Sequence, residues 1–133
     1  MLEYLSTVPN FLVYLGTGVL LLIAFMAAYI LATPQHEIGL IRHGNVSAGV
    51  VFGGTLLGFA LPLASALAHS VNLVDLLTWS LIAGVVQCIA SLILRFVIRD
   101  LRAHIEADRV SVAITMASLK IAMGLLNAAA MVY

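Results

Sequence analysis

Four stretches of the chain are long and apolar enough to cross a lipid bilayer as helices, and this feature constrains the fold most. They cover residues 11–32, 46–68, 74–98 and 110–131. A helix needs about 20 apolar residues to cross the hydrocarbon core of a bilayer. None of the four stretches has an acidic residue away from its ends. We therefore predict an all-α membrane protein with four transmembrane helices.

The residues outside these stretches leave no room for a soluble domain. The chain has 133 residues, of which 63% are hydrophobic and 9% are charged, whereas about 25% of the residues in soluble domains are charged. We expect one transmembrane domain over residues 1–133, with the lipid bilayer as a partner. The formal net charge of zero gives no basis for binding nucleic acid. A single cysteine, Cys88, excludes an internal disulfide.

A shift of 64 residues lays the first stretch on the third and the second on the fourth. In both copies a helix, a polar loop and a Val-Ser helix start follow one another. The identical pairs include Leu12/Leu76, Ile41/Ile105, Val46/Val110, Ser47/Ser111, Ala64/Ala128 and Ala66/Ala130. We predict two helical hairpins as tandem repeats, at residues 11–68 and 74–131. A hairpin crosses the membrane and returns, so both copies have the same orientation, which makes this a parallel repeat.

Outside the apolar stretches, basic residues occur only in the two polar loops that follow the first and third stretches. Arg42 lies in the first of these loops, and Arg99, Arg102 and Arg109 lie in the second. The segment before the first stretch and the 68–73 turn have no Lys or Arg. Cytoplasmic loops carry an excess of Lys and Arg, so we predict that both loops face the cytoplasm and both termini face outside.

Three arginines are spaced four and three residues apart, which places Arg95, Arg99 and Arg102 on one helix face. We expect the third helix to continue into the cytoplasm with this face on anionic lipid headgroups. Each basic residue near such a surface contributes about 1 kcal/mol. The alternative is that the same face binds a cytoplasmic protein partner.

The second stretch carries two overlapping pairs of glycines at a spacing of four, Gly49 with Gly53 and Gly54 with Gly58. In lipid, small residues promote association because they let helix backbones approach closely. We expect one pair to pack inside the subunit and the other to lie at the interface of a homo-oligomer. A glycine-lined conduit is the alternative.

Pro62 lies in the same stretch and predicts a helix kink. Proline has no backbone N–H to donate and crowds the carbonyl four residues earlier, here that of Gly58. We expect Thr55 or a neighbouring helix to bind that carbonyl.

The third and fourth stretches each carry a stripe of polar and small residues at helical spacing. The stripes consist of Ser80, Gly84, Gln87 and Ser91, and of Ala113, Ala117, Lys120, Gly124 and Asn127. We expect both stripes to face protein or water and not lipid, with Gly124 allowing close helix packing. The polar residues serve either interhelical hydrogen bonds, which contribute about 0.6–2 kcal/mol each, or a polar path for an ion or solute.

Lys120 is the one charged residue deep in an apolar stretch, 11 residues or roughly 16 Å of helical rise after Arg109. A charged lysine near the bilayer centre costs about 2.5–3.5 kcal/mol even on insertion scales. Every Asp and Glu lies in a loop or at a helix end, so we expect no acidic partner for Lys120 within the spans. Three alternatives follow: a neutral amine, a hydrated ammonium in a cavity, or an ammonium that holds an anion. The lack of a carboxylate inside the spans also argues against a proton-coupled exporter of cationic drugs.

No nucleophile–base set, carboxylate pair, phosphate-binding loop or cofactor motif is visible in the sequence, so we expect neither an enzyme nor a cofactor. His36, Glu37 and His43 share one loop but do not have the spacing of metal ligands. We expect no metal site.

Residues 39–61, which read GLIRHGNVSAGVVFGGTLLGFAL, resemble the signature of the YjfL-like family of small bacterial inner-membrane proteins, domain of unknown function 350. Residues 111–131, which read SVAITMASLKIAMGLLNAAAM, resemble the closing segment of that family. The resemblance covers nearly the whole chain and implies a tandem pair of two-helix units in the inner membrane. It also implies a link to envelope stress, because genes of the family tend to lie near envelope-stress and polyamine-related genes. Lys120 is not part of the family's pattern.

These observations support two hypotheses for the function. The first is a non-catalytic inner-membrane module that oligomerises through its glycines and acts through protein or lipid partners in envelope maintenance. The second is a small ion or solute channel or transporter, with a polar path formed by Ser80, Gln87, Lys120 and Asn127.

Overall fold

The computed structural model describes residues 1–32 and 37–131, and all regular secondary structure in these ranges is helical. The long helices are α2 (Val8–Ala32), α4 (Val46–His69), α5 (Leu73–Val97) and α7 (Val110–Ala130), and the short ones are α1 (Leu2–Leu5), α3 (Glu37–Arg42) and α6 (Leu101–Glu106). All four long helices have the length and apolar composition of a membrane span. The prediction of an all-α protein with four span-length helices is confirmed.

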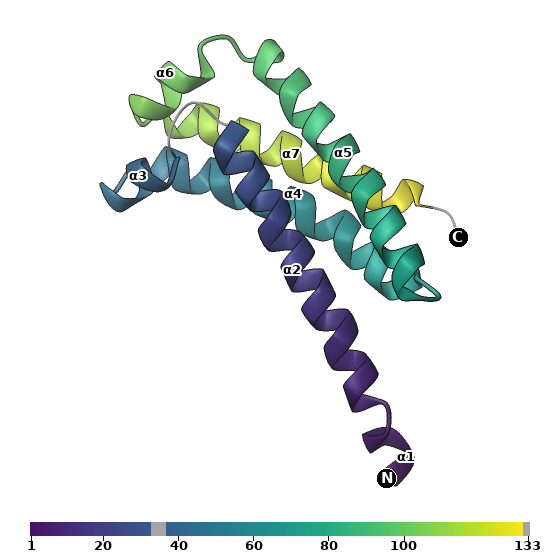
Figure 1. Ribbon diagram of the computed structural model, residues 1–133. Helices are drawn as coiled ribbons and strands as arrows, with labels where there is room; N and C mark the ends of the chain where they lie inside the picture. The colour runs from purple at the N-terminus through teal and green to yellow at the C-terminus, as the bar shows by residue number, and fades with distance from the viewer. Residues whose placement is uncertain (33–36, 132–133) are drawn as a thin grey trace.

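Helices α4 and α7 lie side by side and run in the same direction (Figure 1). Near their starts, the backbone N–H of Ser47 donates to Oδ1 of Asp108 at 2.9 Å. Near their ends, Oγ of Ser65 donates to the carbonyl of Ala128 at 3.2 Å. These two contacts fix the register of the pair along its whole length.

Glycines bring the backbones of α4 and α7 into contact between these two points. A Cβ atom placed on Gly54 would lie 2.5 Å from Cα of Ala117, and one placed on Gly124 would lie 2.6 Å from the carbonyl oxygen of Gly58. Larger side chains would therefore separate the two helices. This is the close approach that small residues permit in membrane helices.

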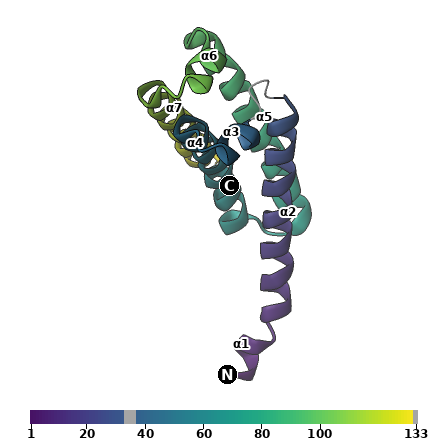
Figure 2. The same cartoon turned by 90° about the vertical axis from the view of Figure 1, so that its left-hand side faces the viewer.

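Helices α2 and α5 run opposite to α4 and α7 and pack on them. On α2 only Gly18, Met26 and Tyr29 are buried, and Phe25 stacks on Phe59 of α4 with ring centroids 5.5 Å apart. The first half of α2 projects beyond the other helices (Figures 1 and 2). Most of α2 is thus exposed at the surface of the helix bundle.

Asparagine caps begin two of the long helices. The side chain of Asn45 accepts a hydrogen bond from the backbone N–H of Ala48 at 2.8 Å, and that of Asn72 accepts one from Asp75 at 2.8 Å. Such caps satisfy backbone donors that the first turn leaves without partners. Asn45 also donates to the carbonyl of Ile105 at 2.8 Å, so the same residue joins the start of α4 to α6.

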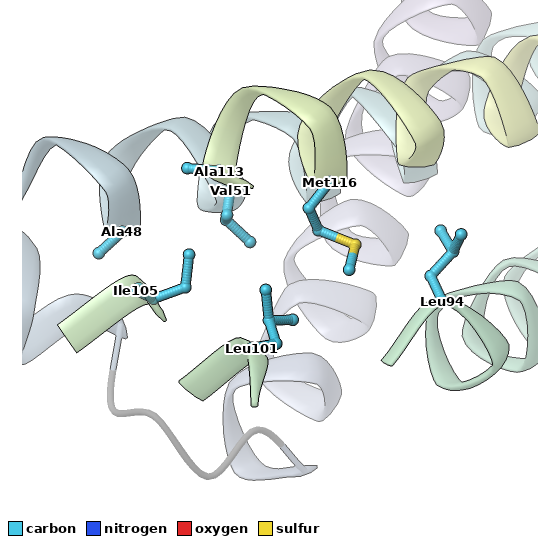
Figure 3. Packing of buried hydrophobic residues seen from close by; sticks show 7 residues of the cluster. All are labelled: Ala48, Val51, Leu94, Leu101, Ile105, Ala113 and Met116. Carbon is cyan, nitrogen blue, oxygen red and sulfur yellow. The ribbon is translucent and has the colours of Figure 1, made fainter. Parts of the chain in front are cut away.

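The predicted continuation of the third helix is wrong. Helix α5 ends at Val97, and Asp100 has a left-handed backbone with φ of 55°, which breaks the helix before α6. The break lets Leu101 and Ile105 fold back into an apolar cluster with side chains of α4, α5 and α7 (Figure 3), and the cluster consists of Ala48, Val51, Leu94, Leu101, Ile105, Ala113 and Met116. Burial of these apolar side chains favours the folded-back path over a straight helix.

The arginines are therefore divided by this break. Arg95 lies on α5, whereas Arg99 and Arg102 lie beyond the end of that helix and are exposed, so the three do not share one helix face. Arg102 forms an ion pair with Glu106 at 3.0 Å. The contact of these arginines with anionic lipid remains a prediction.

The two arginine-containing loops lie at the same end of the bundle, which we call the arginine end (Figure 1). Helix α3 begins at Glu37 and α6 at Leu101, and α4 begins at Val46 and α7 at Val110, so each pair is offset by 64 residues. The repeat and the cytoplasmic orientation of the arginine end remain predictions.

We expect Gly124→Ala to destabilise the bundle by about 1–3 kcal/mol, as overpacking typically does, because its Cβ would meet the backbone of Gly58 at 2.6–2.9 Å. Thermal unfolding in a mild detergent measures this loss. The matched control is Gly16→Ala on α2, where no atom lies within 4 Å of the added Cβ. Equal melting temperatures for the two variants would contradict the tight α4–α7 contact.

We expect the junction between Asp108 and Ser47 to weaken in acid. The hydrogen bond from the backbone N–H of Ser47 holds the pKa of the Asp108 carboxyl below its ordinary value. The ionised Asp108 carboxylate contributes fully to the stability of the fold above its ordinary pKa of about 3.9. This contribution is lost as the pH falls through the lowered pKa.

Asp108→Asn tests this pH dependence, and asparagine tolerates the left-handed backbone at this position. The variant is expected to melt below the unaltered protein at about pH 6, and this gap is expected to close towards about pH 3. A gap that is the same at both pH values would show that the charge of Asp108 plays no part.

Candidate functional site

Lys120 is buried among four helices, with 3% of its surface exposed. Its Nζ atom donates hydrogen bonds to Oγ1 of Thr55 on α4 at 2.8 Å and to the hydroxyl of Tyr29 on α2 at 3.2 Å. Nζ also lies 4.5 Å from the centroid of the Tyr29 ring, within the range of a cation–π interaction. The side chain is thus held by protein groups on α2 and α4.

Glu37 completes this arrangement from the arginine end. The Tyr29 hydroxyl donates to Oε1 of Glu37 at 2.7 Å, and Glu37, the first residue of α3, is 4% exposed. The Glu37 carboxylate attracts the Lys120 ammonium, whereas the Arg95 guanidinium repels it. We call Lys120, Tyr29, Thr55 and Glu37 the Lys120 network.

The expectation that Lys120 has no acidic partner is therefore corrected. Glu37 lies outside the spans, as the sequence indicates, but α3 folds against α4 and buries its carboxylate. The connection to Lys120 runs through the hydroxyl of Tyr29 and is not a direct ion pair. Sequence analysis did not single out Tyr29, and it considered Glu37 only as a metal ligand.

A glycine on α4 makes room for the backbone of α7 beside Lys120. A Cβ atom on Gly58 would lie 2.7 Å from Nε2 of Gln87 and 3.0 Å from the carbonyl oxygen of Lys120. In this space Nε2 of Gln87 donates to that carbonyl at 3.0 Å. Gln87 on α5 thereby fixes the turn of α7 that carries Lys120.

The expected role of Thr55 is different in the structure. Its hydroxyl donates to the carbonyl of Val51 at 3.0 Å and accepts from Lys120, and it does not donate to the carbonyl of Gly58. Pro62 lies inside α4, which continues to His69. The carbonyl of Gly58 faces the backbone of Gly124 on α7.

The other predicted polar residues of α5 and α7 pack between helices. The side-chain amide of Asn127 donates to the carbonyl of Ala83 at 3.0 Å. Like the bond from Gln87 to Lys120, this bond joins a side-chain amide to the backbone of a neighbouring helix. Ser80 and Ser91 are buried, and their hydroxyls have no hydrogen-bond partner among the residues that the structure describes. The amides of Gln87 and Asn127 thus bind neighbouring helices, as the interhelical interpretation expects.

A cavity of about 320 Å³ opens between α2, α4 and α5 towards the arginine end. Its walls are mainly apolar, and its lining residues are Ala28, Tyr29, Ala32, Phe59, Cys88, Ser91, Leu92 and Arg95. None of the four residues of the predicted polar path lines this cavity, and of the other polar stripe residues only Ser91 does. The structure therefore does not bring Ser80, Gln87, Lys120 and Asn127 together around it.

The histidines give no metal site in the part of the chain that the structure describes, where no three metal-ligating side chains cluster. His36 lies outside the described residues. Asp100 and Asp108 both have left-handed backbones and lie in the α5–α7 connection, away from the Lys120 network.

We expect Lys120 and Glu37 to be coupled energetically. Removing one charge of a buried pair leaves the other uncompensated, whereas removing both costs less than the sum. In a double-mutant cycle of Lys120→Met and Glu37→Gln, measured by unfolding in detergent, we expect a coupling of about 0.5–3 kcal/mol. The cycle of Lys120→Met with Glu106→Gln, an exposed carboxylate on α6, is the control and is expected to be additive. Additivity in both cycles would contradict the coupling.

Comparison with known proteins agrees with this architecture. The family model described as Domain of Unknown Function (DUF350) matches residues 3–131. The inner membrane protein YjfL of Escherichia coli strain K12 is 32% identical over 132 residues, which cover 99% of this chain and 100% of the relative, and the same values hold for YjfL of Escherichia coli O157:H7. No solved structure matches the chain significantly. Four span-length helices and this similarity identify a multi-pass inner-membrane protein, and the chain belongs to the DUF350 family of YjfL-like proteins.

Proposed function

We propose that the protein is a non-catalytic inner-membrane module that assembles into a homo-oligomer and serves envelope maintenance through protein or lipid partners. One observation carries this proposal. The space beside Gly54 and Gly58 of α4 is occupied by α7 and α5. Among the described residues, no atom outside the backbone of α4 itself lies within 4 Å of a Cβ atom placed on Gly49 or Gly53. The second glycine pair of the same helix is thus open to a neighbour.

The open pair has the properties of a packing face. Gly49 and Gly53 are one helical turn apart, and Val46 and Leu57, which continue the same row, are about half exposed. In lipid, apolar side chains alone give little drive for association, but small residues let a second backbone approach closely. A second copy of this chain offers a helix with the same small residues.

The channel hypothesis has less support. The side-chain amides of Gln87 and Asn127 donate hydrogen bonds to backbone carbonyls of neighbouring helices. The Nζ atom of Lys120 donates to Thr55 and Tyr29. These side chains stabilise contacts between helices of one subunit. A connection to envelope maintenance rests on the family, and the exposed Arg99 and Arg102 supply a surface for anionic lipid or a cytoplasmic protein.

We expect the double variant Gly49→Leu, Gly53→Leu to weaken the oligomer without lowering the stability of the subunit. In the part of the chain that the structure describes, the Cβ atoms of leucines at these positions meet no atom beyond α4 within 4 Å, but the side chains would block a neighbouring backbone. Single-molecule photobleaching in bilayers counts the subunits.

Gly16→Leu on α2 is the matched control, because its Cβ also lies in open space. Gly58→Leu is expected to unfold the subunit and not to act on assembly alone. A monomer in bilayers for the unaltered protein would overturn the proposal.

A further inference from the structure

Two hydrogen bonds in the Lys120 network point in the same direction. Nζ of Lys120 donates to the Tyr29 hydroxyl at 3.2 Å, and this hydroxyl donates to Oε1 of Glu37 at 2.7 Å. The two bonds connect α7, α2 and α3, so they lead from Lys120 to Glu37, which is also buried but belongs to α3 at the arginine end. A row of donors with one direction is the geometry in which protons move along hydrogen bonds.

We propose that Lys120, Tyr29 and Glu37 form a proton relay that moves one exchangeable proton between the bilayer interior and the arginine end. The inference goes beyond the proposed oligomeric module and does not depend on it. It assigns a proton-binding site to residues that have no catalytic role in the proposed function.

The transfer balances in protons and charge. The Lys120 ammonium passes one proton to the oxygen of Tyr29 as Tyr29 passes its hydroxyl proton to Oε1 of Glu37. The ammonium becomes an amine, the carboxylate becomes a carboxylic acid, and Tyr29 is unchanged. The two opposite charges are neutralised, and the proton then lies on Glu37 at the arginine end.

The surroundings of the relay act on the charge of Lys120 in opposite directions. Burial penalises both charges of an ion pair, which reduces its advantage over the neutral pair. The carboxylate of Glu37 opposes this effect by attracting the ammonium, and Arg95 adds to it by repelling the ammonium. Among the described residues, the groups that face Lys120 from the packed helices are Tyr29 of α2, Glu37 of α3, Thr55 of α4 and Arg95 of α5.

Tyr29 is the intermediate that the relay requires. Its ring remains in contact with Lys120 when its hydroxyl is removed, so Tyr29→Phe interrupts the relay and keeps the cation–π contact. Thr55→Val removes the other hydrogen bond of Nζ but leaves the relay complete. These two variants separate loss of the relay from general loosening of the site.

Lys120 is the only lysine in the chain, so one ¹⁵N-labelled side chain reports on the relay without assignment ambiguity. The measurement is the exchange rate of its Nζ protons with water, by NMR on the full chain in lipid nanodiscs. We expect Tyr29→Phe to slow exchange by at least about tenfold, within the factor that a positioned proton-transfer group contributes. Thr55→Val is expected to leave the rate unchanged or to raise it, and Tyr14→Phe on α2 is the control for the aromatic change.

Glu37→Gln is the second variant. Glutamine keeps an acceptor oxygen for Tyr29 but does not take up the proton, so exchange is again expected to be slower. A purely structural role of the network predicts the opposite, because a loosened site admits water and accelerates exchange. Unchanged or faster exchange in both Tyr29→Phe and Glu37→Gln would overturn the relay.

Discussion

The contact of the α4 and α7 backbones is the constraint on which the rest of the structure depends. The glycines at positions 54, 58 and 124 have no side chains, and larger residues there would hold these helices apart. Because α7 lies so close to α4, the side chain of Lys120 reaches Thr55, and the carbonyl of Lys120 comes within reach of Gln87. The buried charge is thus placed by glycines that carry no polar group themselves.

The buried side chain of Lys120 is in turn the point towards which polar groups of the other helices face. Helix α2 buries few side chains, yet one of them is Tyr29, which binds Lys120 by its hydroxyl and its ring. Since a polar group in hydrocarbon must find partners within the protein, the network holds α2 and α3 in one position more specifically than apolar contacts do. Helix α3 places the carboxylate of Glu37 where it accepts a hydrogen bond from the Tyr29 hydroxyl.

Sequence reasoning reached the architecture because each span is a continuous apolar run that a bilayer must enclose as a helix. It also reached Lys120, because a lone charge in such a run is conspicuous. It could not reach Glu37, because the packing of α3 against α4 decides whether this carboxylate is exposed or buried. The predicted continuation of the third helix is wrong for a related reason. The spacing of the arginines predicts a continuous helix, whereas burial of Leu101 and Ile105 turns the chain back at Asp100. Tertiary contacts, and not local periodicity, decide both positions.

The two glycine pairs of α4 differ in what covers them: other helices cover Gly54 and Gly58 but not Gly49 and Gly53 in the described structure. As an argument for an interface, this difference is stronger than the large apolar surface of α2. In water, an exposed apolar helix would argue strongly for a partner. In a bilayer it does not, because lipid chains are as apolar as leucine. Glycines without a covering group are different, since lipid chains do not reproduce the close contact that another helix backbone gives. One pair on α4 therefore builds the interior that holds Lys120, and the other is the surface on which we propose that a second subunit packs.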